Sequence, residues 1–316
     1  MSTSLDPAVY TSLDALLGTR RHCHELPLFN RPVRSGRQSG QQSSRLRGRG
    51  VDFDQVRAYQ PGDDIRNIDW RVTARTQKVH TKVFNEERER PVFVIGEQSP
   101  RLFFGSQRCF KSVLAAETCA LIAWTALSHH DRVGGMVYGP GGCHEVRPRR
   151  DRKALLQLLQ LLLKANHELR AGLQAEVADE SEPLNLALRH SREIIRPGSI
   201  LYVICDHSAI DGLNQSLLVP LAGHNDLVLL PVSDLLDTSL PLFGPLDFVQ
   251  SDQHLTLDTL QADLRADYAA QFEKQQQSWL KLARRLRCSL IPLDTRFAAH
   301  EQLHDNLTGH PRGTPR

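Results

Sequence analysis

The stretch Ser199-Ile-Leu-Tyr-Val-Ile-Cys205 decides the fold class of this chain, because seven successive residues carry no charge. Similar apolar runs occupy residues 91–95, 132–138, 226–232 and 288–293. Between them lie segments with helical spacing at residues 109–129, 151–167, 184–195 and 259–286. Strands that are apolar on both faces and alternate with helices are typical of a mostly parallel sheet covered by helices on both sides. We therefore predict an α/β fold with its functional loops at the carboxyl ends of the strands, at residues 96–101, 206–211 and 232–237.

Composition and charge divide the chain into four predicted parts. Its 316 residues are 40% hydrophobic and 24% charged, which is ordinary for a globular protein. We expect an N-terminal helix and a basic, flexible loop in residues 1–50, and a small β-rich segment in residues 51–90. The α/β domain is expected at residues 91–296, followed by a C-terminal tail at residues 297–316 that is disordered at its end.

The same features predict a cytoplasmic protein without a membrane span. The N-terminus lacks the basic and apolar regions of a signal peptide. The longest apolar run, residues 112–127, is interrupted by Glu117 and is too short to cross a bilayer. The six cysteines have no metal or disulfide spacing, so we expect buried free thiols.

Residues 62–75, here called the 62–75 cluster, combine dense charge with apolar side chains. Ile65, Ile68 and Trp70 favour burial, so we expect a compact ionic network packed around Trp70, with a structural or docking role. The interleaved charged residues are Asp63, Asp64, Arg66, Asp69, Arg71 and Arg75.

The sequence leaves two other functions open. Clustered carboxylates can hold a metal ion, so Asp63, Asp64 and Asp69 could serve a metal-dependent phosphoesterase. The arginine-rich residues 20–49 could bind nucleic acid, although residues 30–49 contain no aromatic residue for base stacking, and we do not expect this binding.

The sequence also resembles a known family. Residues 49–53, 56–70, 73–75 and 82–87 closely resemble the bacterial domain-of-unknown-function family 58. The likeness continues at residues 104–106, Lys111, residues 131–134, residues 197–198 and Asp206, and it covers residues 45–235.

This resemblance implies a fold and a partner. The second half of such proteins is similar to a von Willebrand factor A domain. Family members are commonly encoded beside MoxR-type AAA+ ATPases, and they are thought to act with them in chaperone-like assembly or maturation. No reaction is established for the family. We therefore expect a non-enzymatic interaction or adaptor module that works with such an ATPase and with other von Willebrand A-domain or client proteins.

The resemblance also implies an altered metal-ion-dependent adhesion site. Von Willebrand A domains often hold a divalent cation through Asp-x-Ser-x-Ser, a later Thr and a later Asp. Glu97, Ser99 and Arg101 align with the first motif, and Asp206 with the last ligand, while no clear Thr stands near residues 181–183. A guanidinium would repel a divalent ion. We expect Arg101 to supply the positive charge by pairing with Glu97 or Asp206, so that no cofactor is needed; binding of Mg²⁺ or Mn²⁺ is the alternative.

Overall fold

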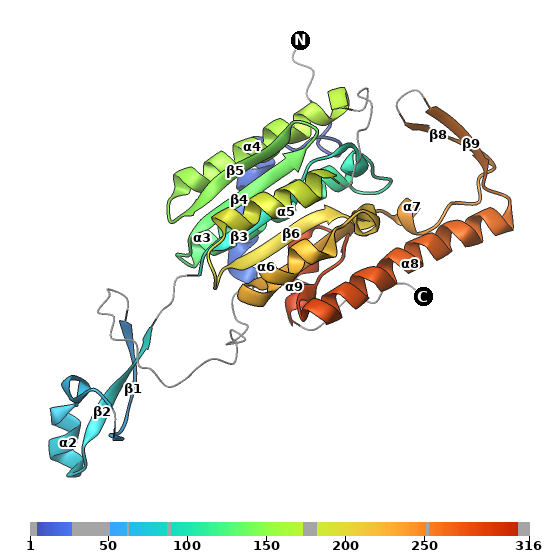
Figure 1. Cartoon of the computed structure of the whole chain (residues 1–316). Coiled ribbons are helices and arrows are strands. Elements are labelled where there is room, and N and C mark those ends of the chain that lie inside the picture. Colours follow the sequence, from blue (N-terminus) through green and yellow to red (C-terminus); the bar gives the residue numbers. More distant parts are fainter. Residues whose placement is uncertain are drawn as a thin grey trace. The chain divides into compact units, whose positions relative to one another are not determined.

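The computed structural model describes residues 5–26, 51–61, 63–86, 90–172, 182–250 and 253–308. Its Cα positions form two compact units (Figure 1). The larger comprises residues 1–33 and 90–316, and the smaller comprises residues 34–89. Each unit is described separately below.

The larger unit is built on a seven-stranded sheet with the strand order β10-β7-β6-β3-β4-β5, in which β11 also pairs with β7 (Figure 1). All neighbouring pairs are parallel except β4 and β5. This arrangement confirms the predicted α/β fold with a mostly parallel sheet. The strands are β3 (Val92–Glu97), β4 (Val133–Gly139), β5 (Gly142–Arg149), β6 (Ile200–Asp206), β7 (Asp226–Ser233), β10 (Ser289–Leu290) and β11 (Leu293–Asp294).

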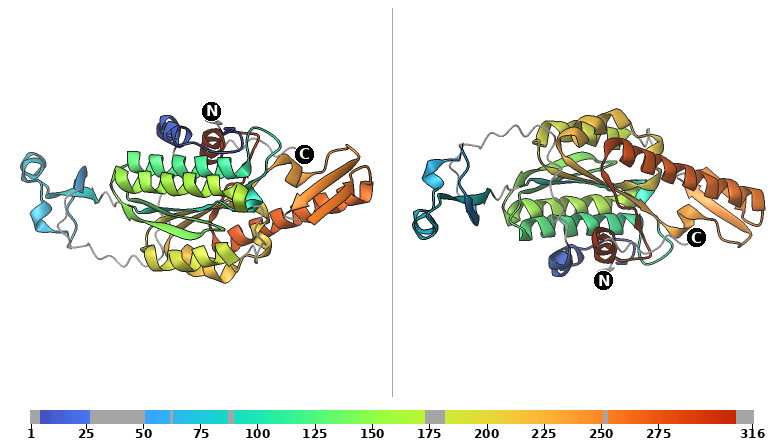
Figure 2. Two further views of the ribbon diagram at one scale, coloured as in Figure 1. Left: turned by 90° about the horizontal axis from the view of Figure 1, so that it is seen from above. Right: turned by 90° about the horizontal axis from the view of Figure 1, so that it is seen from below.

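Helices cover both faces of this sheet (Figure 2). On one face α3 (Lys111–Ser128) and α4 (Arg152–Gly172) lie against the strands, and α1 (Leu13–Gly18) and α9 (Ala299–Thr308) pack outside them. The other face carries α5 (Glu182–Ile194), α6 (Leu218–His224) and α8 (Ala262–Leu286). Among the described residues, no helix is both long enough and apolar enough to cross a membrane.

Successive side chains of the central strands point alternately to the two faces of the sheet, and this produces two separate hydrophobic cores. In β3, Val92 and Val94 belong to the core beneath α3 and α4, whereas Phe93 and Ile95 belong to the core beneath α5 and α8. Successive side chains of a strand point to opposite faces, so a strand covered on both sides must be apolar throughout. This requirement explains the uninterrupted apolar runs of the sequence.

The structure differs from the expected boundaries at both ends of the chain. The N-terminal helix α1 covers only Leu13–Gly18 of residues 1–50, and a 3-10 helix, η1 (Thr19–Glu25), follows it. Leu16 and Cys23 are buried in the core beside α3, so this segment belongs to the α/β unit. At the other end, α9 lies within the expected tail and buries Leu303 completely. Residues 27–50, which hold most of the expected basic loop, and residues 309–316 lie outside the described residues.

The sequence analysis also did not predict the short or partly exposed strands. β5 has only one buried residue, Val146, and β8 (Pro245–Gln250) and β9 (Gln253–Asp258) form a separate antiparallel hairpin. The expected last strand, residues 288–293, is two short strands, β10 and β11, with Ile291 and Pro292 between them. Proline has no N–H to donate to a neighbouring strand, which explains the break.

The smaller unit contains an antiparallel pair, β1 (Val51–Ala58) and β2 (His80–Glu86). A 3-10 helix, η2 (Ile65–Asn67), and the short helix α2 (Trp70–Thr76) connect them. Val56 pairs with Lys82, and the register shifts between Phe53 and Gln55.

We predict that Leu303→Ala lowers the free energy of unfolding by about 2–5 kcal/mol, because it removes a fully buried side chain from the core beneath α9. Leu242→Ala is the matched control, since Leu242 is 71% exposed, and should change the stability by less than about 0.5 kcal/mol. Urea unfolding followed by circular dichroism measures both. Equal, small effects of the two substitutions would show that α9 does not contribute to the core.

Candidate functional site

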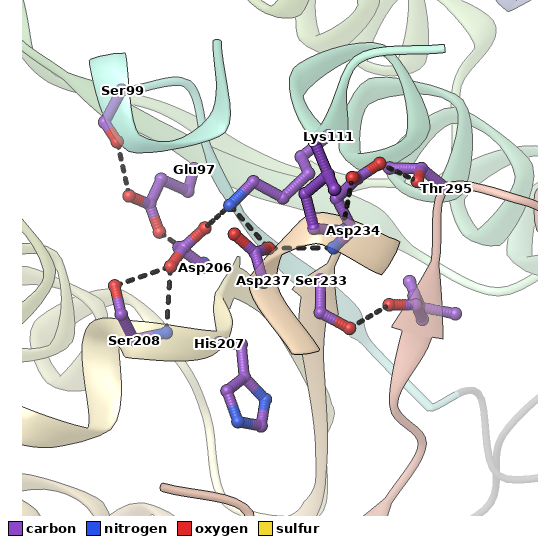
Figure 3. Close-up of polar contacts among 12 residues, drawn as sticks. Glu97, Ser99, Lys111, Asp206, His207, Ser208, Ser233, Asp234, Asp237 and Thr295 are labelled. Carbon is purple, nitrogen blue, oxygen red and sulfur yellow. Dashed lines mark hydrogen bonds and ion pairs between the residues drawn. The ribbon is translucent and has the colours of Figure 1, made fainter. Parts of the chain in front are cut away.

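Charged side chains meet at the carboxyl edge of the sheet, where β3, β6 and β7 end (Figure 3). Glu97 is the last residue of β3 and Asp206 the last of β6. The short helix α7 (Leu235–Thr238) follows β7 and carries Asp237. Lys111 reaches the same place from the first turn of α3. Parallel strands bring their carboxyl ends to one edge, so residues distant in sequence become neighbours.

Lys111 is the central cation of this site, although its side chain is only 5% exposed. Its Nζ donates to Asp206 Oδ2 at 2.7 Å and to Asp237 Oδ2 at 3.0 Å (Figure 3). Burial opposes its charge, but the carboxylates of Asp206 and Asp237 outweigh that effect and raise the pKa of Lys111. A cation at the N-terminus of a helix is unfavourable with respect to the helix dipole. The two carboxylates are therefore what makes this position acceptable for Lys111.

Asp206 is held from two sides. Besides the ion pair with Lys111, its Oδ1 accepts hydrogen bonds from Ser208 N at 2.8 Å and from Ser208 Oγ at 2.6 Å. Burial opposes ionisation of this carboxyl group, but Lys111 and Ser208 more than compensate, so the pKa of Asp206 is lowered. The group is ionised and each of its oxygens has a partner.

Glu97 lies beside Asp206 and is also buried. It accepts hydrogen bonds from Ser99 Oγ at 2.5 Å, Tyr138 OH at 2.9 Å and Asp206 N at 2.8 Å. Burial, followed by the negative charge of Asp206, raises the pKa of Glu97. The two carboxyl groups thus differ, because Asp206 has a cation at hydrogen-bond distance and Glu97 has hydroxyl and amide donors.

Asp234 and Asp237 join this edge to two further loops. Asp234 caps α7 and Asp237 closes the capping box by accepting from Asp234 N at 2.8 Å. Asp234 also accepts from Ser106 N at 2.9 Å, from Ser106 Oγ at 2.5 Å and from Thr295 Oγ1. Burial opposes its ionisation, but these hydrogen bonds dominate and lower the pKa of Asp234. The loop before α3, the α7 turn and the segment after β11 are therefore tied together.

The residue between Glu97 and Ser99 connects the site to the N-terminal segment. Gln98 Nε2 donates to Ser112 O at 3.0 Å, and its Oε1 accepts from Asn166 Nδ2 at 3.0 Å. Asn166 Oδ1 in turn accepts from Thr11 N at 2.9 Å. At Gly139, a Cβ atom would lie 2.0 Å from Gln98 O, so the close packing of this loop requires glycine.

The expected site residues do converge, but the cation bonded to Asp206 is Lys111. Glu97, Ser99 and Asp206 lie together as the strand-end argument requires (Figure 3). Arg101 lies in the 3-10 helix after β3, and its charge lowers the pKa of Tyr138 and Cys205, in each case against a larger opposing effect of burial. Its expected pairing with Glu97 or Asp206 stays a prediction. Ser181, at the expected Thr position, lies outside the described residues.

Sequence reasoning missed Lys111, Asp234 and Asp237 as site residues. The sequence does carry a signal for Lys111, since it is the single cation of a mainly apolar helical segment. Asp234 and Asp237 lie within residues 232–237, a strand-end loop that the sequence had already marked. The sequence could not show that these residues pair, because Lys111 and Asp237 are 126 positions apart.

The 62–75 cluster does not form the expected network around a buried Trp70. Asp63 pairs with Arg57 in a bidentate contact, with N–O distances of 2.7 and 2.9 Å, and the hydrogen bonds from Arg57 are the main cause of its lowered pKa. Asp64 caps η2 and Asp69 caps α2. Trp70 is 68% exposed.

Ile65 is also exposed, to 66%. Within the described part of the smaller unit, Arg66, Arg71 and Arg75 form no ion pair with Asp63, Asp64 or Asp69. The expectation of burial was wrong because a strand pair and two short helices offer too little apolar surface to enclose a Trp. The carboxylates, for their part, have closer donors in Arg57 and in the backbone N–H groups.

We predict that Glu97→Gln stabilises the protein increasingly as the pH rises. Because the folded pKa of Glu97 is raised, the unfolded chain loses this proton first above its ordinary pKa of about 4.5, and the free energy of unfolding then falls with pH by at most about 1.4 kcal/mol per pH unit. Glutamine does not titrate. Urea unfolding at pH 5, 6, 7 and 8 measures the difference from the wild type, with exposed Glu273→Gln as the control. A difference that is constant with pH would contradict the assignment.

Comparisons with known proteins identify the family. The family model "Protein of unknown function DUF58" matches residues 55–278. Uncharacterized protein Rv1480 of Mycobacterium tuberculosis and uncharacterized protein Mb1516 of Mycobacterium bovis are each 25% identical over 223 residues, which is 70% of this chain and 68% of theirs.

Two solved structures show a weaker likeness. BatB from Bacteroides thetaiotaomicron is 15% identical, with 69% of this chain and 97% of that chain covered and a TM-score of 0.39. An aerotolerance-related membrane protein from Bacteroides fragilis is 14% identical, with 69% and 98% covered and a TM-score of 0.38. The family model, in contrast, spans more than half of the chain, and the protein therefore belongs to the DUF58 family.

Proposed function

We propose that this protein is a non-enzymatic adaptor that binds a MoxR-type AAA+ ATPase in the cytoplasm and supports the assembly or maturation of client proteins. The observation that carries the proposal is the exposure of Ile65 and Trp70 in the smaller unit. Exposed apolar side chains that gather in one place are typical of surfaces that become buried against a partner, and Ile65 and Trp70 lie in the same short segment. Tryptophan is also among the residues that contribute most to binding energy in protein interfaces.

The charges around these residues favour an acidic partner surface. Arg66, Arg71, Arg75 and Lys78 are all exposed. The nearby acids have local bonds: Asp63 with Arg57, and Asp64 and Asp69 with backbone N–H groups of the helices that they cap. Arg71 and Arg75 are four residues apart in α2, so they share one side of the helix. An acidic surface with an apolar centre would complement this set of side chains.

The same local bonds favour binding over phosphoester hydrolysis at Asp63, Asp64 and Asp69. Two of these carboxylates serve as helix caps and the third holds Arg57, so each has a structural use. The identity of the partner rests on the family resemblance, which associates such proteins with MoxR-type ATPases and with other von Willebrand A-domain proteins. The exposed surface supports a protein partner of complementary charge.

We predict that the double substitution Ile65→Ala/Trp70→Ala reduces recovery of an AAA+ ATPase at least tenfold when the tagged full-length chain is purified from its native host. The loss is expected because the change removes both large apolar contacts without altering a charge. Quantitative mass spectrometry identifies and measures the ATPase. Phe243→Ala is the matched control, since Phe243 is 77% exposed but lies in the larger unit, and it should leave recovery unchanged.

Two outcomes would contradict this function. If the wild-type chain recovers no AAA+ ATPase, the proposed partner is wrong. If the double variant recovers as much ATPase as the wild type, the smaller unit is not the contact surface. Circular dichroism of the purified variant shows that any loss of binding does not come from unfolding.

A further inference from the structure

The resemblance to von Willebrand A domains raises the question of whether Glu97, Ser99 and Asp206 can hold a divalent cation. The contacts of these residues answer it. Asp206 Oδ2 is 2.7 Å from Lys111 Nζ, and Asp206 Oδ1 accepts both hydrogen bonds from Ser208. Glu97 accepts from Ser99, Tyr138 and Asp206 N. Every carboxylate oxygen of the pair is thus already bonded within the protein.

The position of the Lys111 ammonium conflicts with a metal ion. Mg²⁺ binds carboxylate oxygens at about 2.0–2.1 Å and requires a nearly octahedral set of oxygen ligands. An ion bound to Asp206 would lie beside a buried ammonium group that is itself bonded to Asp206 and Asp237. The ammonium and the metal ion are both positive, and two positive charges next to each other repel strongly in a buried site. The residues present therefore do not fit a divalent ion while Lys111 is in place.

We propose that the Lys111 ammonium is the resident cation of this site, where it replaces a divalent ion and closes the site to metals. It joins the end of β6 to the α7 turn through Asp206 and Asp237, as a metal bridging two carboxylates would. Its Nζ also lies 5.9 Å from the centre of the Phe104 ring, which contributes a cation–π contact. The built-in charge keeps the strand-end loops in one arrangement without any ion from solution.

This proposal is independent of the partner suggested above, because it concerns only the charge within the larger unit. It predicts that the wild-type protein neither binds Mn²⁺ nor gains thermal stability from it. It also predicts that a metal site can be created by removing the ammonium. In Lys111→Ala, the carboxylates of Asp206 and Asp237 remain and the space of the lysine side chain becomes available to an ion.

The experiment uses Mn²⁺ as the probe with the full-length chain. Bound Mn²⁺ is counted by electron paramagnetic resonance, and the Tm is measured with 1 mM MnCl2 or with EDTA. We expect no bound Mn²⁺ in the wild type, and one saturable Mn²⁺ with a higher Tm in Lys111→Ala. Lys111→Ala/Asp206→Asn, which lacks a required ligand, and Lys111→Met, which fills the space, should bind none.

Two results would overturn the proposal. The first is saturable Mn²⁺ binding by the wild type that Asp206→Asn abolishes. The second is a folded Lys111→Ala variant that binds no Mn²⁺. If Lys111→Ala does not fold in EDTA, it is purified in MnCl2 instead. Recovery of folded protein with one Mn²⁺ then supports the proposal, and failure to fold with Mn²⁺ while Lys111→Met folds contradicts it.

Discussion

The carboxyl edge of the sheet depends on one buried ion pair, in which the Lys111 ammonium bonds to both Asp206 and Asp237. A charge removed from water is unfavourable unless it is paired and hydrogen-bonded. The three groups come from the start of α3, the end of β6 and the α7 turn. The two hydrogen bonds of one ammonium group therefore hold three segments together. Loss of any one group would leave a buried charge without its partner, which is strongly destabilising.

Around this ion pair, each acidic group has its own set of donors. Glu97 accepts hydrogen bonds from hydroxyl and amide donors, and Asp234 accepts them from Ser106 and Thr295. These two acidic groups therefore have hydrogen-bond partners other than Lys111. The result is a network whose members bond to one another. Such an arrangement gives a rigid edge with fixed loops, which suits a surface that a partner recognises.

The smaller unit shows the opposite distribution. Its carboxylates form local caps and the contact between Asp63 and Arg57, while Ile65 and Trp70 remain in water. A unit of this size has too much surface for its volume to enclose every large apolar group. The larger unit also exposes Leu242 and Phe243. In the smaller unit the exposed apolar side chains lie in the same segment as exposed arginines, and this combination led us to propose the binding function there.

The sequence by itself determined the α/β class and the strand-end placement of Glu97, Ser99 and Asp206. It could do so because a strand covered on both faces needs an uninterrupted apolar run, which is a local pattern. The half-exposed β5 and the isolated hairpin lack that pattern and were not predicted. Only the tertiary structure decided that Lys111 is the cation of Asp206, 95 positions away, and that Trp70 is exposed. Ion pairing and burial depend on which distant segments the packing brings together, and no local pattern records that.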